Sequence, residues 1–455
     1  MSATEKEALK RKAEAEKKED KTSKNRKEND ISNGRWEKCQ IQANKLIFFK
    51  IVYNEKDFNK FQNLNCENCF QPTYTYALFE KEIIHGYKGL KILISLTPKT
   101  FYAHLNIKYV KKLPNSDNLE EIFANYFNGR CTTDKNIFVS ELKKENDLQK
   151  PKGKLIYENK TRKIYNIDIL NDDFTSESHS LQALCTLFID GTSFIPLETN
   201  FWGYFLVIEY DKENDKNNNW HTIGFTCYKN FHIEYNKYYT KLSQFLVLPP
   251  YQRKGVGTFL LENFYNYLSK EDNNCLEITS EDADIEFILM RDYTISKILI
   301  HEKLLDNLLK LFTGNFIDSK NIYDKFNIDK KEMTKICKKL KLQELLIGRA
   351  FDIIKFGLVA NNKELSAFLE NELKEKFKKI IEENSFENVK SKRIRGPFIY
   401  FNKDNFYDYK KYYKEKSLIS SYRRLEILFP EYIGDIEKIT PKIYEMVIDY
   451  KSRLN

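Results

Sequence analysis

The chain has 455 residues, of which 41% are apolar and 31% are charged, and this length suits two or three packed domains. Its net charge of +9 is modest and is spread along the chain, so charge alone does not indicate a nucleic-acid-binding protein. Eight cysteines are too few for a disulfide scaffold, and no apolar run reaches the roughly 18 residues of a membrane helix. We therefore expect a soluble protein of a reducing compartment.

Residues 1–34 consist almost entirely of charged and small polar residues. Such a segment buries too little apolar surface to offset its conformational entropy, so we expect a disordered charged tail. The basic clusters at residues 10–12 and 26–27 fit either a nuclear import signal or ordinary solvated charge.

Residues 35–185 are expected to form a mixed α/β domain. Its strand candidates, in chain order, are residues 46–53, 89–96, 101–110, 155–157 and 163–170. The short turn with Pro98 predicts a hairpin between the second and third candidates, and the fourth and fifth indicate another hairpin.

Residues 186–300 are expected to form a central α/β core with a mixed sheet. A helix is predicted just before it, at residues 178–188. The elements predicted within it are strands at residues 204–210, 221–228 and 241–248, a helix at 258–268 and a short strand at 276–279.

The spacing of apolar residues becomes helical after Asp292, so residues 301–455 are expected to form a helical C-terminal domain. The predicted helices are residues 333–346, 350–359, 363–381 and 441–450. Thr440 and Pro441 fit the N-cap and the first position of the last helix. Residues 392–397 and 406–414 are predicted to form a loop or insertion.

The most informative segment joins the strand at residues 241–248 to the helix at 258–268. A Pro-Pro turn and the basic, glycine-containing loop at residues 252–257 connect them. A helix N-terminus presents unpaired N–H groups and the positive end of the helix dipole, so it binds phosphates. Glycine at positions 255 and 257 allows a close approach of the backbone. An ordinary glycine-containing turn is the alternative interpretation.

Two well-known phosphate-binding motifs do not fit this loop. A dinucleotide-binding fingerprint requires a third glycine where this chain has Leu260, and a P-loop requires Gly-Lys followed by Ser or Thr. The pattern Gln/Arg-x-x-Gly-x-Gly/Ala instead resembles the acyl-coenzyme A loop of GNAT acetyltransferases.

Several motifs together resemble the catalytic subunit of type B histone acetyltransferases. They are SQFLVLPPYQRKGVG at 243–257, EITSED at 277–282, LMRD at 289–292, HGYKGLKI at 85–92, TSFI at 192–195 and WGYFLV at 202–207. The resemblance spans about residues 70–360 and implies a GNAT acetyltransferase core. The chain departs from the family pattern at Arg253-Lys254, where Gly-Gln is usual, at Ala283, where proline is usual, and after residue 362.

The resemblance implies that Glu281 is the catalytic base, acting through a water, and that Asp282 assists it. A base is needed because a lysine ammonium has a pKa of about 10.4, so that its neutral form costs roughly 4–5 kcal/mol at pH 7. A partly buried carboxylate would be the better base. A surface Glu-Asp pair at a strand end is the alternative.

The resemblance also implies that acetyl-CoA is the co-substrate, that no metal is used and that no covalent enzyme intermediate forms. The backbone of Phe245, Leu246 and Val247 would polarise the thioester and pair with the pantetheine arm. The residues expected around the pyrophosphate are Gln252, Arg253, Lys254, Gly255, Val256, Gly257 and Thr258.

The expected acceptor is the amino-terminal tail of newly made histone four. The positions that match substrate contacts of the family are Glu80, Glu82, Trp202, Lys229, Asn230 and Phe231. Carboxylates complement a basic peptide and aromatic side chains pack on lysine stems. Lys229 replaces a tyrosine of the family and would locally repel such a peptide. Surface charge alone is the alternative interpretation of the two glutamates.

The resemblance further implies a WD-repeat propeller partner that binds histones, residence in nucleus and cytoplasm, and no direct contact with membrane or nucleic acid. Three other functions remain open on the sequence. They are a GNAT enzyme for another protein or a small amine, a non-catalytic histone-binding subunit, and a basic nucleic-acid binder.

Two further features are set aside as functional sites. Cys66 and Cys69 form a CxxC pair, but a structural zinc needs two more ligands at suitable spacing, so we expect free thiols. His179 and His232 are isolated histidines, for which packing or surface roles are expected.

Overall fold

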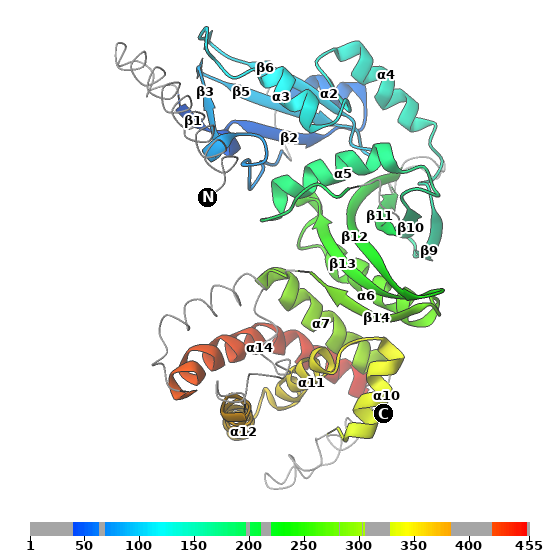
Figure 1. Cartoon of the computed structure of the whole chain (residues 1–455), viewed down its shortest axis with the longest axis vertical. Helices are drawn as coiled ribbons and strands as arrows, with labels where there is room; N and C mark the ends of the chain where they lie inside the picture. The colour runs from blue at the N-terminus through cyan, green and yellow to red at the C-terminus, as the bar shows by residue number, and fades with distance from the viewer. Residues whose placement is uncertain are drawn as a thin grey trace, which may run out of the picture. The chain divides into compact units, whose positions relative to one another are not determined.

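The chain divides into two compact units, each of which is described by itself. The computed structural model describes residues 40–62, 69–196, 201–210, 220–281, 283–302, 304, 328–383 and 421–452 (Figure 1). The first unit comprises residues 1–149 and 176–195, and the second comprises residues 150–175 and 196–455. Within the described segments, no helix has both the length and the apolar character needed to cross a membrane.

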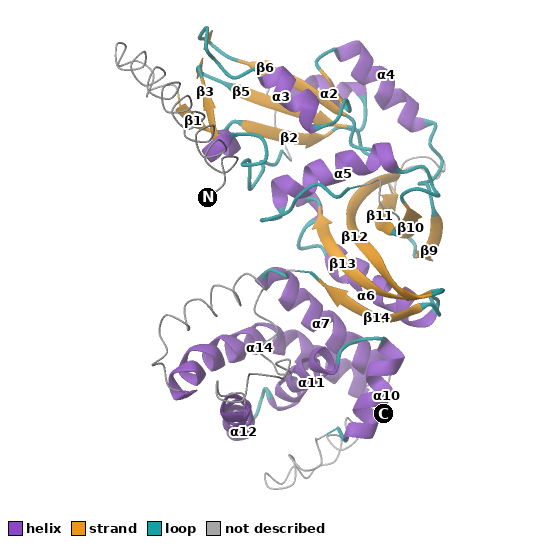
Figure 2. Ribbon diagram, in the orientation of Figure 1, coloured by secondary structure: helices purple, strands orange, loops and turns teal. Residues whose placement is uncertain are grey.

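The first unit is built on a four-stranded sheet with helices packed on it (Figure 2). The sheet has the order β2 (Ile47–Ile51), β5 (Lys91–Leu96), β6 (Ala103–Lys108) and β8 (Cys131–Thr132). Its helices are α2 (Glu55–Gln62), α3 (Leu119–Tyr126), α4 (Lys135–Asn146) and α5 (Thr175–Phe188), the last from its second residue. β5 and β6 pair antiparallel, which confirms the hairpin predicted around Pro98.

Short elements complete this unit. They are β1 (Gln40–Gln42) paired with β3 (Ile83–His85), β4 (Tyr87–Lys88) paired with β7 (Lys111–Lys112), and the 3-10 turns η2 (Ala43–Lys45) and η3 (Glu80–Glu82).

The second unit is built on a mixed sheet, as expected, and this sheet has six strands. In spatial order the strands are β14 (Cys275–Ser280), β13 (Lys237–Val247), β12 (Trp220–Glu234), β11 (Trp202–Tyr210), β10 (Arg162–Asp168) and β9 (Lys154–Glu158). All neighbours pair antiparallel except β13 and β14, which are parallel because the long helix α6 (Val256–Lys270) connects them.

One apolar core joins this sheet to the helices of the second unit. The helices after α6 are α7 (Ile285–His301), α10 (Lys330–Leu340), α11 (Glu344–Val359), α12 (Lys363–Glu383) and α14 (Ser421–Ser452). Buried residues of every one of them belong to the same cluster as Phe205 and Val207 of β11. The fold is therefore α/β with a GNAT-like core and a helical C-terminal region.

The pairing of β13 with β14 covers only part of β13. It runs from Tyr238 to Leu242, and the N–H of Glu281, the first residue after β14, donates to the carbonyl of Leu242 at 2.9 Å. The last five residues of β13, residues 243–247, extend beyond this pairing, and residues 244–247 pair with β12 on their other side. This edge of β13 leads directly into the loop at residues 252–257.

Two predicted helix boundaries in the C-terminal region are wrong. The helix expected at 333–346 is broken at Lys341, whose φ of +56° ends α10 and lets Leu342 enter the core. Thr440 is not an N-cap, because it lies inside α14, where its hydroxyl donates to the carbonyl of Ile436 at 2.8 Å. Pro441 lies within the same helix.

The division into units differs from the expected boundaries at residues 185 and 300. The β9–β10 hairpin belongs to the six-stranded sheet although it precedes residue 185, and the helical region shares the core of that sheet. The predicted tail at 1–34 and the predicted loops at 392–397 and 406–414 lie outside the described residues.

Candidate functional site

The loop between β13 and α6 has the backbone geometry of an open helix N-terminus. A 3-10 turn, η4 (Pro249–Tyr251), ends β13, and Arg253 and Gly255 both take positive φ, at +59° and +74°. Gly255 is the N-cap of α6 and caps it with no side chain. A Cβ at Gly255 would meet no atom within 4 Å, so glycine is needed there for its backbone conformation alone.

Three other helices have a side-chain cap, whereas α3 and α11 begin without one, as α6 does. Asp134, Asp284 and Asp329 each accept hydrogen bonds from the first backbone N–H groups of α4, α7 and α10. The helix α6 has glycine where those helices have a carboxylate. Its first N–H groups are therefore left for an external acceptor, and the dipole favours an anion.

Gly257 lies close to α7 and to β13. A Cβ at this position would lie 2.6 Å from the sulfur of Met290 in α7, and Val247 and Phe245 are its next neighbours. A Cβ at this position would displace the Met290 side chain, so glycine allows α6 to pack closely against α7 and β13.

The two basic side chains of the loop are exposed. Arg253 Nη2 lies 2.9 Å from Glu286 Oε2 at the start of α7, and both side chains are largely solvent-accessible. Lys254 Nζ donates to the carbonyl of Pro250 at 2.8 Å and lies over the ring of Tyr251. Exposed contacts of this kind contribute little to stability, so both cations remain able to turn toward an anion.

The remaining residues of the predicted coenzyme site belong to the loop, to the end of β13 and to the first turn of α6. Gln252 Nε2 donates to the carbonyl of Val247 at 2.9 Å and so ties the loop to the strand end. Phe245 stacks edge-on with Phe287 of α7, with ring centroids 5.5 Å apart. Leu246 and Val256 are buried, whereas Thr258 is partly exposed in the first turn of α6.

Glu281 lies directly after β14 and is held by two side chains of β13. Lys241 Nζ lies 2.5 Å from Oε1, and the hydroxyl of Ser243 donates to Oε2 at 2.9 Å. The Glu281 side chain is 39% exposed, so the carboxylate is partly buried and faces solvent on one side. Asp282 lies outside the described residues.

A row of paired residues crosses the sheet beside Glu281. Trp202 pairs with Lys229, Lys229 with Lys241, and Lys241 with Thr279. Directly paired residues point to the same face of a sheet, so the side chains of Trp202, Lys229 and Lys241 share a face with the Glu281 contact. Two of the predicted substrate-binding side chains are thus on the face of the predicted base.

Lys229 is packed between aromatic rings. Its ammonium lies 5.1 Å from the ring centroid of Trp202 and 5.3 Å from that of Phe231. These cation–π contacts hold the ammonium beside the two rings, and its positive charge remains. Asn230, between Lys229 and Phe231, points to the opposite face by strand alternation and accepts a hydrogen bond from Thr240 at 2.8 Å.

A cavity of about 400 Å³ lies at this end of the sheet. Asp168, Phe201, Trp202, Tyr228, Asn230 and His232 line it, among others. Phe201 takes a φ of +79°, and its ring lies 4.2 Å from that of His232. Trp202 and Asn230, from the predicted substrate set, are therefore together at its rim, although they differ in the face they point to within the sheet.

Glu80 and Glu82 belong to the first unit. Glu82 accepts hydrogen bonds from the backbone N–H of Thr75 at 2.6 Å and from its hydroxyl at 3.1 Å, and its φ is +58°. It therefore stabilises its own turn. Glu80 is exposed at the start of η3.

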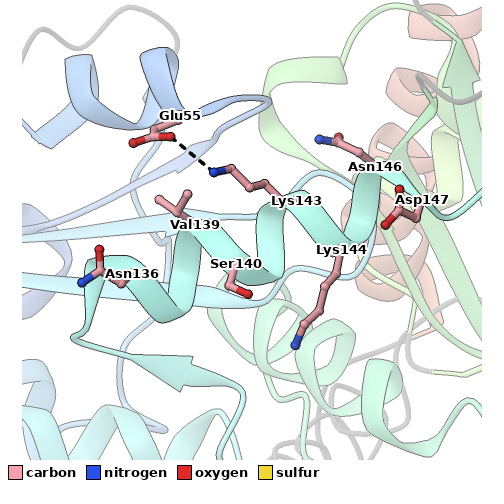
Figure 3. A pocket seen from close by; sticks show the side chains of 8 residues that line it. All are labelled: Glu55, Asn136, Val139, Ser140, Lys143, Lys144, Asn146 and Asp147. Atoms are coloured by element: carbon pink, nitrogen blue, oxygen red, sulfur yellow. Dashed lines mark ion pairs between the residues drawn. The ribbon is translucent and has the colours of Figure 1, made fainter.

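The first unit has a hollow of its own, between the start of α2 and α4 (Figure 3). Its polar rim includes Glu55 and Lys143, which face each other at 3.9 Å across it, together with Lys144 and Asp147. None of these residues was singled out from the sequence.

The expectation of free thiols at the CxxC pair is wrong for Cys69, which is disulfide-bonded. Its partner is not among the described cysteines, because the other five, at 131, 185, 227, 275 and 337, are free. Cys66 lies outside the described residues. His179 is partly exposed, and burial lowers its pKa.

Two residues of the site were missed from the sequence, namely Lys241 and Ser243. Alternation along the strand that precedes the loop puts both on one face, and that signal was present in the sequence. Their contact with Glu281, about forty residues further on, depends on the parallel register of β13 and β14.

Comparison with known families agrees with this geometry. A sequence model described as the N-terminus of histone acetyl transferase HAT1 matches residues 39–190, and the model of the MOZ/SAS family matches residues 150–386, more than half of the chain. The two matches overlap at the β9–β10 hairpin and at α5.

Individual relatives are similar over the same region. The histone acetyltransferase type B catalytic subunit of Candida albicans is 31% identical over 305 residues, which cover 63% of this chain and 70% of that protein. The corresponding human protein is 31% identical over 281 residues, or 57% of this chain and 64% of its own length. A histone acetyltransferase type B catalytic subunit of Dictyostelium discoideum is 29% identical over 294 residues, which cover 61% of this chain and 60% of that protein. The matches with the last two thus span slightly less than two thirds of those relatives. The helix N-terminus without a side-chain cap after β13 and the carboxylate of Glu281 beside that strand agree with these matches. The chain belongs to the histone acetyltransferase family of type B catalytic subunits.

Proposed function

We propose that this chain transfers the acetyl group of acetyl-CoA to lysine side chains in the amino-terminal tail of newly made histone four, by direct attack in a ternary complex. The observation that carries the proposal is that an uncapped helix N-terminus and a carboxylate lie at different positions along the same strand, β13. The anion-binding N-terminus of α6 follows the end of β13, and Glu281 meets β13 at residues 241–243.

The length of this edge fits a long donor. Residues 243 and 247 are separated by four strand steps, or roughly 13 Å at about 3.3 Å per residue, and the turn at residues 248–251 adds to this. A donor that bridges the two ends must have an anionic group and a reactive group joined by an extended arm. Acetyl-CoA has this form, with a diphosphate, a pantetheine arm and a thioester.

The coenzyme end of the proposed site consists of backbone and cationic groups. The N–H groups at the start of α6 would donate to the diphosphate, and Arg253 and Lys254 would add positive charge. The N–H groups along residues 245–247 would pair with the arm and donate to the acyl carbonyl. Coenzyme binding supplies the activated acyl group, and the protein supplies its orientation.

At the acyl end, Glu281 is proposed to accept the proton of the acceptor ammonium through a water. Its partial exposure leaves room for such a water, and its two donors on β13 hold the carboxylate in place. Asp282, the next residue, is proposed to assist in proton transfer.

The acceptor peptide is proposed to bind on the sheet face that carries Trp202, Lys229 and Phe231, beside Glu281. Glu80 is proposed, from the resemblance alone, as a residue that contacts a basic tail. A WD-repeat propeller is proposed as the histone-binding partner, and nucleus and cytoplasm as the places of action. These points rest on the resemblance to the family.

The test of the base is Glu281→Gln, which keeps the shape of the side chain and removes its basicity. Turnover should fall by about 10²–10⁴-fold, while binding of coenzyme A, measured by calorimetry, should be nearly unchanged. Glu277→Gln is the matched control, because Glu277 lies on the same strand with its carboxylate bonded to Gln343, and its turnover should remain close to wild type.

Unchanged turnover in Glu281→Gln would exclude Glu281 as the base. The acceptor is tested separately by comparing kcat/KM for a histone-four tail peptide with other histone and non-histone peptides. If the histone-four peptide were the poorest acceptor, the proposed substrate would be wrong and a GNAT enzyme for another acceptor would be favoured.

A further inference from the structure

The carboxylate of Glu281 is flanked by a cation that the reaction outlined above does not use. Lys241 Nζ is 2.5 Å from Oε1, and the Lys241 side chain is 29% exposed. We propose that Lys241 is a positioning residue that keeps Glu281 ionised and aimed at the open edge of β13. This inference rests on the proposed role of Glu281 as the base.

The geometry separates two contributions of Lys241. Its ammonium stabilises the charged form of the adjacent carboxylate, which is the form that accepts a proton. Its hydrogen bond to Oε1, together with that of Ser243 to Oε2, fixes the plane of the carboxylate. Each carboxylate oxygen has two lone pairs, so both oxygens can accept a further donor, such as a water, in this orientation.

Other charged groups around Glu281 have different partners. Lys229 of β12 lies opposite Lys241 but has its ammonium over the rings of Trp202 and Phe231. Arg291 of α7 reaches Ser280, next to Glu281, at 3.5 Å, and pairs with the buried carboxylate of Asp292 at 3.4 Å.

On β14 itself, Glu277 is bonded to Gln343. At the start of α7, Glu286 is paired with Arg253, and Asp284 caps the helix. Among the described side chains, Lys241 is therefore the cation whose contact with Glu281 the structure defines.

Three substitutions separate charge from orientation. Lys241→Met removes both, Lys241→Gln keeps a hydrogen-bond donor without the charge, and Lys241→Arg keeps both. Lys237→Met is the matched control, because Lys237 lies on the same strand, four residues before Lys241, and donates to the carbonyl of Asn273. It removes the same charge without touching Glu281.

The measurement is kcat and KM for acetyl-CoA and a histone-four peptide from pH 5 to 9, on the full chain. For Lys241→Met we expect kcat on its plateau to fall by about 10–100-fold, because the base is no longer oriented. The acid limb of kcat/KM should also move to higher pH, because the carboxylate loses its stabilising charge. KM for the peptide should change little.

The other variants should divide these effects. Lys241→Gln should recover most of the plateau while its acid limb remains displaced, and Lys241→Arg should resemble wild type in both. Lys237→Met should match wild type throughout. Thermal unfolding and coenzyme A binding, measured for each variant, show whether the fold is intact.

The inference is overturned if Lys241→Met retains the wild-type plateau and acid limb, or if it raises KM for the peptide while kcat stays the same. Glu281→Gln separates this failure from that of the proposed function. If Glu281→Gln is inactive and Lys241→Met behaves like wild type, the inference about Lys241 is wrong and the proposed base stands. Full activity of Glu281→Gln removes the proposed base and the inference with it.

Discussion

At the scale of the residue, buried polar side chains determine how the first unit responds to acid. His104 of β6 is 5% exposed, and its ring lies edge-on to Phe58 at 4.9 Å. Burial lowers the pKa of His104 from 6.5 to about 4, because the charged imidazolium loses its hydration. The unfolded chain therefore binds a proton at His104 between pH 6.5 and 4 that the folded unit does not bind.

This difference in bound protons makes the first unit less stable as the pH falls. The stability due to neutral His104 is fully present above pH 6.5 and is lost as the pH falls toward 4, by up to about 3 kcal/mol. His104→Leu should flatten this dependence, since it leaves no group to protonate. The unfolding free energy of the first unit at pH 7 and at pH 5 can be measured by hydrogen exchange of the β5 and β6 amides under urea, corrected for the intrinsic exchange rates. His301→Leu, in the second unit, should leave the dependence unchanged, and equal slopes in His104→Leu and wild type would contradict the assignment.

At the scale of the element, the start of α6 differs from that of the helices with an aspartate cap. Its N-cap is Gly255 with a φ of +74°, whereas α4, α7 and α10 begin with an aspartate cap. A carboxylate at the start of α6 would occupy the place proposed for the diphosphate. A glycine N-cap costs the helix only roughly a few tenths of a kcal/mol relative to a capping side chain, and it leaves the first N–H groups to the proposed ligand.

Gly255→Asp tests this interpretation. The added carboxylate should weaken coenzyme A binding on the order of tenfold or more, through repulsion of the phosphates. Gly129→Asp is the control, since Gly129 has a φ of +75° and equally open surroundings in the first unit. Isothermal titration with coenzyme A should show a loss for Gly255→Asp and none for Gly129→Asp. Equal affinities of the two variants would place the diphosphate elsewhere.

Helix α14 shows the limit of local signals at the same scale. The Thr440-Pro441 pair has the form of a helix start, yet the helix runs through it from Ser421 to Ser452. Ile436 and Ile443, on either side of the pair, are fully buried in the core shared with α11. A Cβ on Gly357 of α11 would meet Ile443 at 2.6 Å, so the two helices pack closely. This burial outweighs the hydrogen bond that Pro441 removes.

At the scale of the whole molecule, buried ion pairs connect three helices of the second unit, α7, α11 and α14. Arg349 of α11 contacts Asp292 of α7 and Asp435 of α14, the latter at 3.2 Å, and lies over the ring of Tyr432. The side chains of Arg349 and Asp292 are 3% and 1% exposed. Because Arg291 beside Asp292 also reaches Ser280, the end of β14 is held by this network.

Arg349→Met should destabilise the second unit by about 3–5 kcal/mol, because Asp292 would remain buried without its main cation. Urea unfolding followed by the fluorescence of the buried Trp220 measures the change. Lys438→Met is the control, because Lys438 pairs with the same Asp435 but is 58% exposed, and should cost no more than about 1 kcal/mol. Similar losses in both variants would show that the network does not hold the helices together.

The sequence by itself was enough to predict the strand–loop–helix unit around residues 243–258 and the helix or strand character of most elements. It also pointed to Glu281 as the candidate base. These features are local, since a strand, a turn or an open helix N-terminus depends on residues a few positions apart. Only the tertiary structure decided that β9 and β10 join the central sheet, that Gly257 serves packing, that α14 passes through Pro441 and that Lys241 holds Glu281. Each of these depends on contacts between residues tens of positions apart, whose burial and charge pairing arise only when the chain has folded.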